Sequence, residues 1–173
     1  MSTIQPTEAA SSTAIAVRTC AVILEGRQVC LIHRDRPDGD QYSLPGGLVH
    51  ADEEVPAALA RELKEELDLD LSALPGQPEL RWVQDQITSR PGSDAPFRRL
   101  HLIHVLHVPP HIRQTLADTE QDADDHARIV WTDLDQAARL HLYPAAGEAL
   151  SALATHDSPV LLPPITDRTY SWR

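Results

Sequence analysis

Three glutamates, Glu62, Glu65 and Glu66, have the spacing that points most clearly to chemistry. Separations of three and four residues place them on one face of an α-helix, where like charges repel and weaken the helix. A divalent cation bound between them would reverse that repulsion. Mg²⁺ prefers oxygen ligands and is often shared between one or two carboxylates and the phosphates of a substrate. The cluster therefore indicates a metal site for phosphate chemistry, whereas an isolated cluster of this kind is more often a solvated acidic face.

Charged and flexible residues just upstream favour the metal site over the solvated face. Arg61 directly precedes the glutamates, and Glu53 lies eight residues before Arg61. Gly46 and Gly47 come shortly before Glu53, and glycine lets a backbone carbonyl approach a bound ion closely. An arginine beside carboxylates keeps them ionised and fixes their direction. We therefore expect residues 46–69 to act as one unit.

This unit resembles the Nudix box, G-x5-E-x7-R-E-U-x-E-E-x-G-U, in which U is an aliphatic residue. The match runs from Gly47 through Glu53 to Leu69, and every defined position agrees except the last glycine, which is Asp68 here. A spaced match of this many positions is far more specific than a short motif. Asp tolerates the left-handed backbone that commonly follows a helix end. The departure is therefore expected to cost a little stability and to leave the carboxylates untouched.

The resemblance to the Nudix family implies a role for each part of the box. Three glutamates would be catalytic and would bind Mg²⁺, or Mn²⁺ in its place: Glu62, Glu65 and Glu66. Any of the three could also orient or deprotonate the attacking water. The carbonyl of Gly46 would be a further metal ligand, and Arg61 with Glu53 would form an ion pair that holds the loop against the helix.

The resemblance also implies a reaction, the hydrolysis of a phosphoanhydride bond in a nucleoside diphosphate linked to another group. The partner would be a small phosphorylated substrate. The alternative is a non-catalytic module that senses a nucleotide or a sugar nucleotide, although a pure sensor would not need three crowded acids. Oxidised nucleotides, ADP-ribose, dinucleoside polyphosphates and sugar nucleotides all stay open as substrates, because loops outside the box choose among them.

Candidate substrate contacts outside the box rest on weaker signals. Three arginines that end a strand or follow a flexible loop are candidates for binding phosphate: Arg34, Arg98 and Arg99. Four acids could supply an additional carboxylate: Glu120, Asp122, Asp124 and Asp125. A solvated surface charge explains each of them at least as well. Three histidines recur every third residue in an expected strand, so neighbours point to opposite faces and cannot share one metal ion: His101, His104 and His107.

The hydrophobic pattern predicts the elements that must position these residues. The clearest is a helix over 54–67, in which Leu59, Leu63 and Leu67 form one apolar stripe. Strands are expected over 14–24 and 28–33, as a hairpin, and over 80–88, 97–108 and 127–132. Loops are expected over 34–41 and 89–96, an irregular acidic segment over 109–126, and helices over 133–140 and 145–154. Strands on both sides of one strong helix predict an α/β (α+β) fold, an α/β/α sandwich around a mixed sheet.

Length and composition limit the domain count and the partners. A chain of 173 residues fits one catalytic domain, expected over 13–155, with a disordered leader over 1–12 and a Pro-rich tail over 156–173. The net charge of −11 makes a nucleic acid polymer a poor partner. Without an apolar signal core or membrane span, the protein is expected to be cytoplasmic, with Cys20 and Cys30 as buried free thiols. A homodimer is compatible with the sequence.

Overall fold

The computed structural model describes residues 14–37, 39–89, 95–120, 127–153 and 158–169. The expected leader over 1–12 lies outside these residues, as do Asp122, Asp124 and Asp125. Within them, nine strands form one sheet: β1 (Ala16–Glu25), β2 (Gln28–Arg36), β3 (Gly39–Ser43), β4 (Gly46–Leu48), β5 (Glu79–Thr88), β6 (Phe97–His107), β7 (Arg128–Asp133), β8 (Leu142–Tyr143) and β9 (Ile165–Asp167). The helices are α1 (Val55–Leu67), α2 (Pro110–Arg113), α3 (Leu134–Ala137) and α4 (Gly147–Ser151), with a 3₁₀ turn η1 at Leu71–Ala73.

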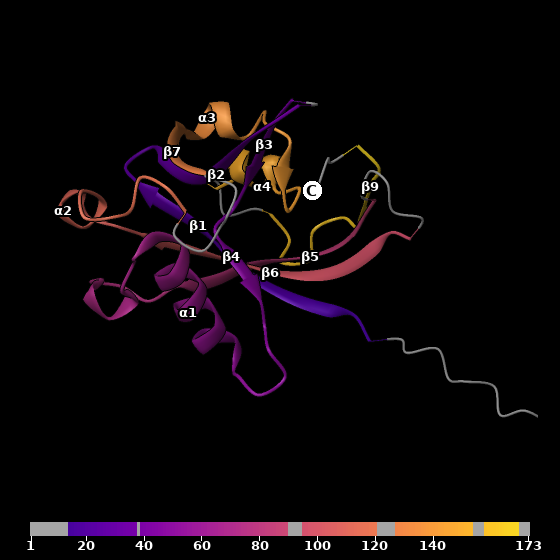
Figure 1. Cartoon of the computed structure of the whole chain (residues 1–173), viewed down its shortest axis with the longest axis horizontal. Helices are drawn as coiled ribbons and strands as arrows, with labels where there is room; N and C mark the ends of the chain where they lie inside the picture. Colours follow the sequence, from indigo (N-terminus) through magenta and orange to yellow (C-terminus); the bar gives the residue numbers. More distant parts are fainter. Residues whose placement is uncertain (1–13, 38, 90–94, 121–126, 154–157, 170–173) are drawn as a thin grey trace, which may run out of the picture.

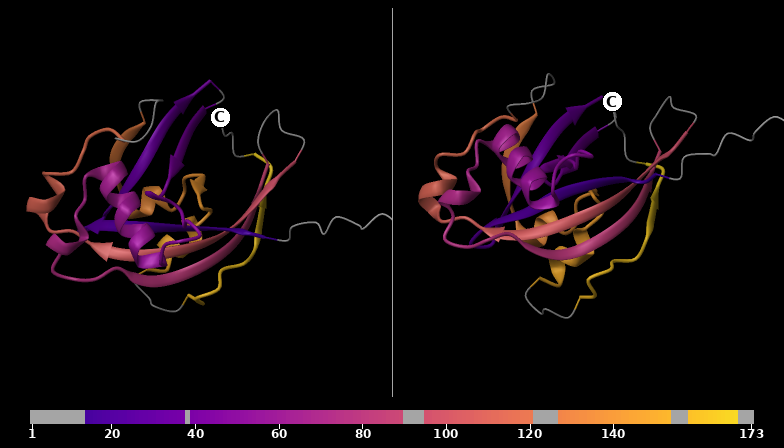
Figure 2. Two further views of the ribbon diagram at one scale, coloured as in Figure 1. Left: turned by 60° about the horizontal axis from the view of Figure 1, so that its bottom comes forward. Right: turned by 90° about the horizontal axis from the view of Figure 1, so that it is seen from below.

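The sheet divides into two wings that share only one end. Strands β1 and β2 form the expected hairpin around Gly26, but they pair only at Leu24–Val29 and Glu25–Gln28. Beyond that point β1 pairs with β4 and β6, whereas β2 pairs with β3 and β7. The β2–β3 hairpin therefore stands away from the β1–β6–β5 wing, as Figure 2 shows.

Helices cover both faces of the sheet (Figure 1). On one face, Leu59, Leu63 and Leu67 of α1 pack with Ala21 and Ile23 of β1. On the other face, alternate residues of β1 pack with residues of α3 and α4, among them Cys20, Val22, Ala137, Ala149 and Leu150. This is the α/β/α sandwich around a mixed sheet that the sequence predicts, and Cys20 and Cys30 are buried free thiols in it.

Helix α1 begins and ends almost as the sequence predicts. It follows Glu54, has Pro56 in its first turn and ends at Leu67. Asp68 then adopts the left-handed conformation, with φ of 58° and ψ of 27°, and its backbone N–H donates to the carbonyl of Lys64 at 3.0 Å. Asp68 therefore occupies the left-handed position that the signature gives to glycine, as expected.

Several expected boundaries are wrong. Residues 34–36 and 39–41 are not loop, because β2 continues to Arg36 and pairs with β3 in a second hairpin, with Arg34 opposite Gln41. Pairing satisfies the backbone groups of the two strands while Asp35 and Asp40 stay exposed to solvent. The helices expected over 133–140 and 145–154 are only α3 and α4, and the segment after 109 opens with the short helix α2.

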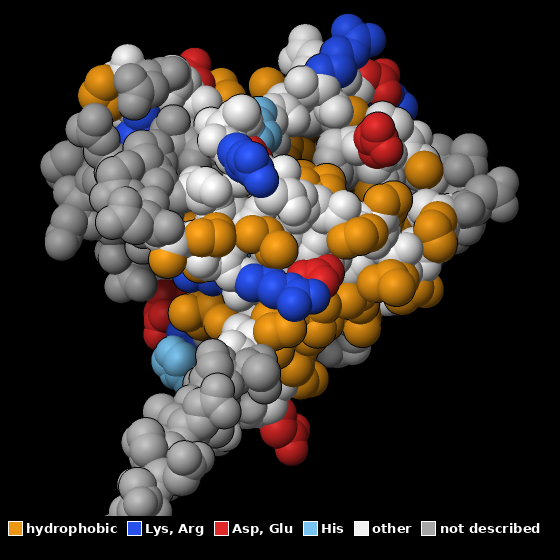
Figure 3. All heavy atoms as spheres, turned by 90° about the vertical axis from the view of Figure 1, so that its right-hand side faces the viewer, with side chains coloured by type: hydrophobic (Ala, Val, Ile, Leu, Met, Phe, Trp, Pro, Cys, Tyr) orange, Lys and Arg blue, Asp and Glu red, His pale blue; other side chains and the backbone are white. Residues whose placement is uncertain are grey.

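The Pro-rich segment after residue 156 contributes to the sheet. Strand β9 pairs with β5 in parallel and forms the sheet edge. The buried Trp82 indole donates to the hydroxyl of Ser158 at 2.8 Å. Figure 3 views the molecule from this side, where apolar side chains gather in a band with a few charged groups among them. None of the helices in the described part of the chain is long and apolar enough to span a membrane.

Candidate active site

The turn that opens the box is built on a glycine for steric reasons. Gly46 has a φ of 132°, and a Cβ placed on it would lie 2.2 Å from the carbonyl oxygen of Thr19 on β1. Its backbone N–H donates to a carboxylate oxygen of Glu66 at 2.6 Å. Close packing of β4 on β1 therefore requires glycine here, and this packing brings Glu66 of α1 to the turn.

Gly47 is required for a different reason. A Cβ on Gly47 would lie 2.2 Å from the carboxyl carbon and one oxygen of Glu62. The Glu62 side chain, only 12% exposed, therefore lies directly against the turn. Glu62 and Glu66, one helical turn apart, both converge on the backbone of Gly46 and Gly47.

Arg61 connects the loop with the helix. Its guanidinium donates to both carboxylate oxygens of Glu53, at 2.6 and 3.1 Å, and to the carbonyl of Leu48 at 3.1 Å. It also donates to Glu62 at 2.8 Å and to Glu65 at 3.2 Å. The hydrogen bonds from Arg61 lower the pKa of Glu53 to about 2, so this carboxylate stays ionised. The Arg61–Glu53 ion pair thus connects the loop with α1.

Glu66 has an unusual environment for a carboxylate. Burial raises its pKa to about 8, against the opposing effect of the charge on Arg18, and the nearby negative charges of Glu120 and Glu62 raise it further. A buried acid between two other acids is poorly tolerated without a counter-charge. The arrangement indicates a place where an additional positive charge would be stabilised.

The donor set fits a hard divalent cation in type. Glu62, Glu66 and the Gly46 carbonyl offer only oxygens at one turn, and Mg²⁺ commonly takes one or two carboxylates together with substrate phosphates. Glu65 is turned toward Arg61 and its side chain is 43% exposed. No three His, Cys, Asp or Glu side chains of the described residues already surround a common point. Binding of a cation through all three glutamates would therefore require Glu65 to leave Arg61.

One site residue, Arg18 on β1, was missed by the sequence reasoning. Its side chain is buried and donates to the carbonyls of Leu44 and Gly46, and one of its terminal nitrogens has no partner among the described residues. Arg18 thus brings a positive charge into direct contact with the Gly46 carbonyl, the proposed metal ligand. The only signal in the sequence was a charged residue within an otherwise apolar strand.

The three candidate phosphate-binding arginines lie in different places. Arg34 pairs with Glu120 and donates to Ser43 at 3.2 Å, so both Arg34 and Glu120 lie near Glu66. Arg98 instead pairs with Asp85 on the surface of β5 and β6.

Arg99 lies on the opposite face of β6 from Arg98. Its guanidinium donates to the Tyr143 hydroxyl at 3.0 Å and lies 4.6 Å from the centre of the Phe97 ring. The structure therefore brings Arg34 to the box and leaves Arg98 and Arg99 in contacts of their own. Of the four candidate acids, Glu120 is the one that the described residues include.

The histidines of β6 do not share a site, as the sequence predicts. His101 is fully buried, His104 is largely buried on the other face, and His107 is exposed. Neither ring nitrogen of His101 has a hydrogen-bond partner within the described residues. The edge of its ring contacts Tyr143, with the ring centres 5.0 Å apart. Burial lowers the pKa of His101 to about 2, and the nearby charges of Arg18 and Arg99 contribute.

His101 should make the protein sensitive to acid. In the unfolded chain its pKa returns to about 6.5, so below that pH the unfolded state binds a proton that the folded state rejects. The contribution of neutral His101 to the free energy of unfolding is complete above pH 6.5 and falls as the pH drops toward 2. Near pH 5 the loss is about 2 kcal/mol, because each pH unit corresponds to about 1.4 kcal/mol.

Urea unfolding at pH 7.5 and pH 5 measures this loss in the wild type and in His101→Phe, which keeps an aromatic ring against Tyr143. The variant should lose less stability between the two pH values. His107→Phe, at the exposed end of the same strand, serves as the control and should follow the wild type. Equal losses in all three proteins would show that His101 is not the source of acid sensitivity.

Comparisons with known proteins identify the family of this fold. The family model of the NUDIX domain matches residues 14–153. The chain is similar to the crystal structure of a MutT NUDIX hydrolase from Burkholderia pseudomallei, with 26% identity and a TM-score of 0.52 over 70% of this chain and 85% of that one. No curated protein sequence matches it.

More distant structures share the fold. A MutT protein from Methanosarcina mazei Go1 has 16% identity and a TM-score of 0.60, over 87% of this chain and all of that one. A C. elegans Ap4A hydrolase has 19% identity and a TM-score of 0.54, over 82% and 96% of the two chains. Because the family model covers most of the sequence, the chain belongs to the NUDIX family and is a hydrolase that acts on pyrophosphate bonds.

Proposed function

We propose that this protein hydrolyses a phosphoanhydride bond in a nucleoside diphosphate linked to another group, with Mg²⁺ or Mn²⁺ as its cofactor. The observation that carries the proposal is the convergence of Glu62 and Glu66 on the Gly46–Gly47 turn, with Arg61 bonded to Glu53, Glu62 and Glu65. The similarity to an enzyme named as an Ap4A hydrolase supports a nucleotide as the substrate.

The position of each residue in the site suggests its role in the reaction. Glu62, Glu65, Glu66 and the Gly46 carbonyl would hold the cation, which would supply positive charge to offset that of the phosphate oxygens. Water attacks phosphorus, a carboxylate accepts its proton, and the bridging P–O bond breaks so that the leaving phosphate takes the electron pair. Arg61 and Glu53 keep the carboxylates oriented, and most of the rate enhancement comes from positioning and charge.

The proposed substrate contacts outside the box follow from the same geometry. Arg34 lies near Glu66 through its pair with Glu120, so it is the best placed of the candidate arginines to meet a phosphate. A planar guanidinium suits phosphate oxygens. To bind phosphate, Arg34 would have to leave Glu120, as Arg98 would have to leave Asp85 and Arg99 would have to leave Tyr143.

A substrate panel tests the proposal. The purified protein is incubated with Mg²⁺ and nucleoside triphosphates, dinucleoside polyphosphates, ADP-ribose or sugar nucleotides, and the products are separated and counted. We expect turnover of one class, its loss when EDTA removes the metal, and its return when Mg²⁺ or Mn²⁺ is added in excess. Tight nucleotide binding without turnover of any compound would contradict the proposal and favour a sensing module.

A further inference from the structure

Helix α1 covers only part of one face of the sheet (Figure 2). Under the helix, Ala21 and Ile23 of β1 are fully buried. Toward the start of β1, the same face continues beyond the helix over positions of β1, β6 and β5 that lie opposite one another. The apolar side chains at these positions are only partly buried, and we call them the open face: Val17, Leu100, Leu102, Val83 and Ile87.

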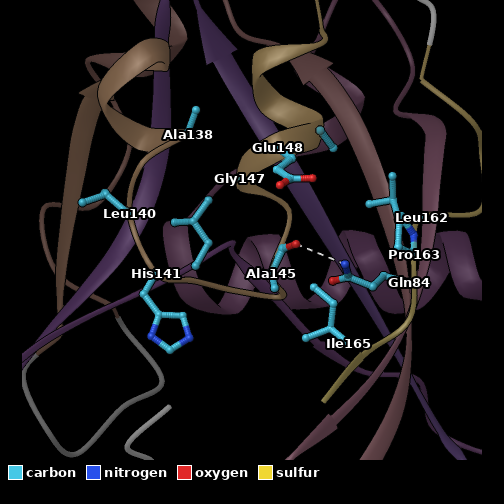
Figure 4. Close-up of a pocket in the computed structure, with 12 residues that line it drawn as sticks. Gln84, Ala138, Leu140, His141, Ala145, Gly147, Glu148, Leu162, Pro163 and Ile165 are labelled. Atoms are coloured by element: carbon cyan, nitrogen blue, oxygen red, sulfur yellow. Dashed lines mark hydrogen bonds between the residues drawn. The ribbon is translucent and has the colours of Figure 1, made fainter. Parts of the chain in front are cut away.

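The pattern along β5 is the reverse of what solvent exposure would favour. Gln84 and Gln86 are buried, whereas Val83 and Ile87 are partly exposed. On the buried side, the segment from α3 to α4 and the segment before β9 close over the strand around a cavity of about 330 Å³, where Gln84 donates to the Ala145 carbonyl at 3.1 Å (Figure 4). A strand with one solvated face usually places its polar residues on that face. The apolar residues on the open face therefore indicate a surface that is covered by something else.

Apolar residues with still greater exposure border the open face. Leu161 bridges to Val83 of β5 and is 65% exposed, and Leu80, opposite His104 on β6, is 47% exposed. His104 also lines a mostly apolar groove of about 460 Å³ between α1, η1 and the sheet. Single apolar residues are ordinary on a protein surface, but a continuous apolar surface across three strands marks a contact site.

One ion pair lies within the open face. Arg98 of β6 donates to both carboxylate oxygens of Asp85 on β5, at 2.8 and 2.5 Å, and both side chains are partly exposed. They share this side of the sheet with the apolar residues, because Arg98 lies opposite Ile87 and Asp85 lies opposite Leu100. The two charges cancel, so they leave the open face neutral in a chain with a net charge of −11.

This balance of charge favours a second copy of the chain as the partner. Two copies that each carry a net charge of −11 repel each other over most of their surface. Repulsion is weakest where opposite charges are present in equal number, as they are on the open face. A two-fold axis sets the same patch of two copies against each other, so that each pair of contacts occurs twice. Arg98 of one copy can then face Asp85 of the other, with the apolar residues buried around them.

We infer that the open face is the contact surface of a homodimer, in which the β1–β6–β5 faces of two copies stack around two reciprocal Arg98–Asp85 ion pairs. Stacked sheets lie about 10 Å apart with their side chains interdigitated. Burial of the apolar residues supplies most of the affinity, and the ion pairs fix how the two copies are placed. The inference concerns association and does not depend on the proposed reaction.

Reversal of the two charges tests the inference. Sedimentation equilibrium of the full-length protein over a series of concentrations should show a mass that rises from that of one chain toward that of two. Arg98→Asp and Asp85→Arg each set like charges against each other, so each variant alone should raise the dissociation constant by about 100-fold or more. Mixed in equal amounts, the two variants carry opposite charges and should associate again as a heterodimer.

Arg27→Asp and Asp135→Arg are the matched controls. Arg27 and Asp135 form an exposed ion pair at 2.7 Å away from the open face, beside the β1–β2 turn. The control variants, alone or mixed, should keep the wild-type dissociation constant.

Leu161→Ser tests the apolar part of the surface. The side chain is largely exposed, so its loss should not affect folding, and it should raise the dissociation constant by about tenfold. Circular dichroism checks that each variant is folded. A wild type that stays monomeric throughout the series would overturn the inference and leave the open face to a different partner. A dimer that the open-face variants do not weaken, or a mixture of Arg98→Asp and Asp85→Arg that stays monomeric, would overturn it as well.

Discussion

Glu66→Gln is expected to lower kcat by about 10²- to 10³-fold, the range observed when an enzyme loses one group that stabilises charge in the transition state. Gln has the same shape and can still accept the hydrogen bond from the Gly46 N–H, so the turn should keep its geometry. What the change removes is the negative charge of the most buried of the three glutamates. Steady-state kinetics on the substrate found in the panel, at saturating Mg²⁺, measure the effect.

Stability measurements separate this loss from unfolding. Burial raises the pKa of Glu66 to about 8, so the folded metal-free protein resists losing this proton between the ordinary glutamate pKa of 4.5 and about 8. The folded state then binds more protons than the unfolded one, and the stability of the metal-free wild type falls as the pH rises through this window. Glu66→Gln has no proton to lose. In the absence of metal its melting temperature should therefore be at least that of the wild type at pH 8.

Two further variants complete the test. Glu54→Gln, on an exposed residue at the start of the same helix, makes the same chemical change outside the site and should leave kcat unchanged. Glu65→Gln should also lower kcat, because it removes the negative charge with which Glu65 would bind the cation after leaving Arg61. Wild-type kcat in folded Glu66→Gln would contradict the role given to this carboxylate.

Gly47→Ala should lower kcat/KM by about 10²-fold while the protein stays folded. The added methyl would lie 2.2 Å from the Glu62 carboxylate, which is the far end of a flexible side chain and can move aside together with its hydrogen bond from Arg61. The backbone of Gly47 does not have the positive φ that favours glycine. The fold therefore loses little, whereas a displacement of about 1 Å at a reacting site can cost about 10²-fold in rate.

Gly46→Ala provides the contrast. Its Cβ would lie 2.2 Å from the carbonyl of Thr19, which is backbone, and its φ of 132° is strained for any other residue. This variant should lose both activity and thermal stability. Measured side by side, Gly47→Ala should lose activity with a melting temperature within a few degrees of the wild type. A large fall in melting temperature for Gly47→Ala would show that the Glu62 side chain cannot yield.

The box could be predicted from the sequence because its geometry is local. Residues three and four apart on a helix share a face whatever the rest of the chain does. The spacing of Glu62, Glu65 and Glu66 is therefore enough to predict that they lie together. The apolar stripe of Leu59, Leu63 and Leu67 sets the buried face of that helix by the same rule.

The tertiary structure decided the residues that meet the box from elsewhere. Arg18 lies 28 residues before Gly46 in the chain, and only the pairing of β1 with β4 brings its side chain to the Gly46 carbonyl. Glu120 reaches Glu66 because β7 pairs with β2 and the Glu120 backbone N–H donates to the carbonyl of Ala127 just before β7. Neither contact leaves a periodic signal, since each depends on the register between strands far apart in sequence.

The polar composition of residues 34–41 predicted a loop. This prediction was wrong because backbone pairing, and not burial of side chains, stabilises the strands there. The segment 34–41 is polar and contains Pro37 and Gly39, so it has the composition of a loop, yet residues 34–36 pair with residues 39–41 in the strands β2 and β3. Nothing in the sequence indicated that Arg18, His101 and Gln84 lie opposite one another, because they come from three different strands. By itself the sequence determined the helical carboxylates and the family. The sheet alone decided which distant side chains face them, because register between strands follows from the packing of the whole fold.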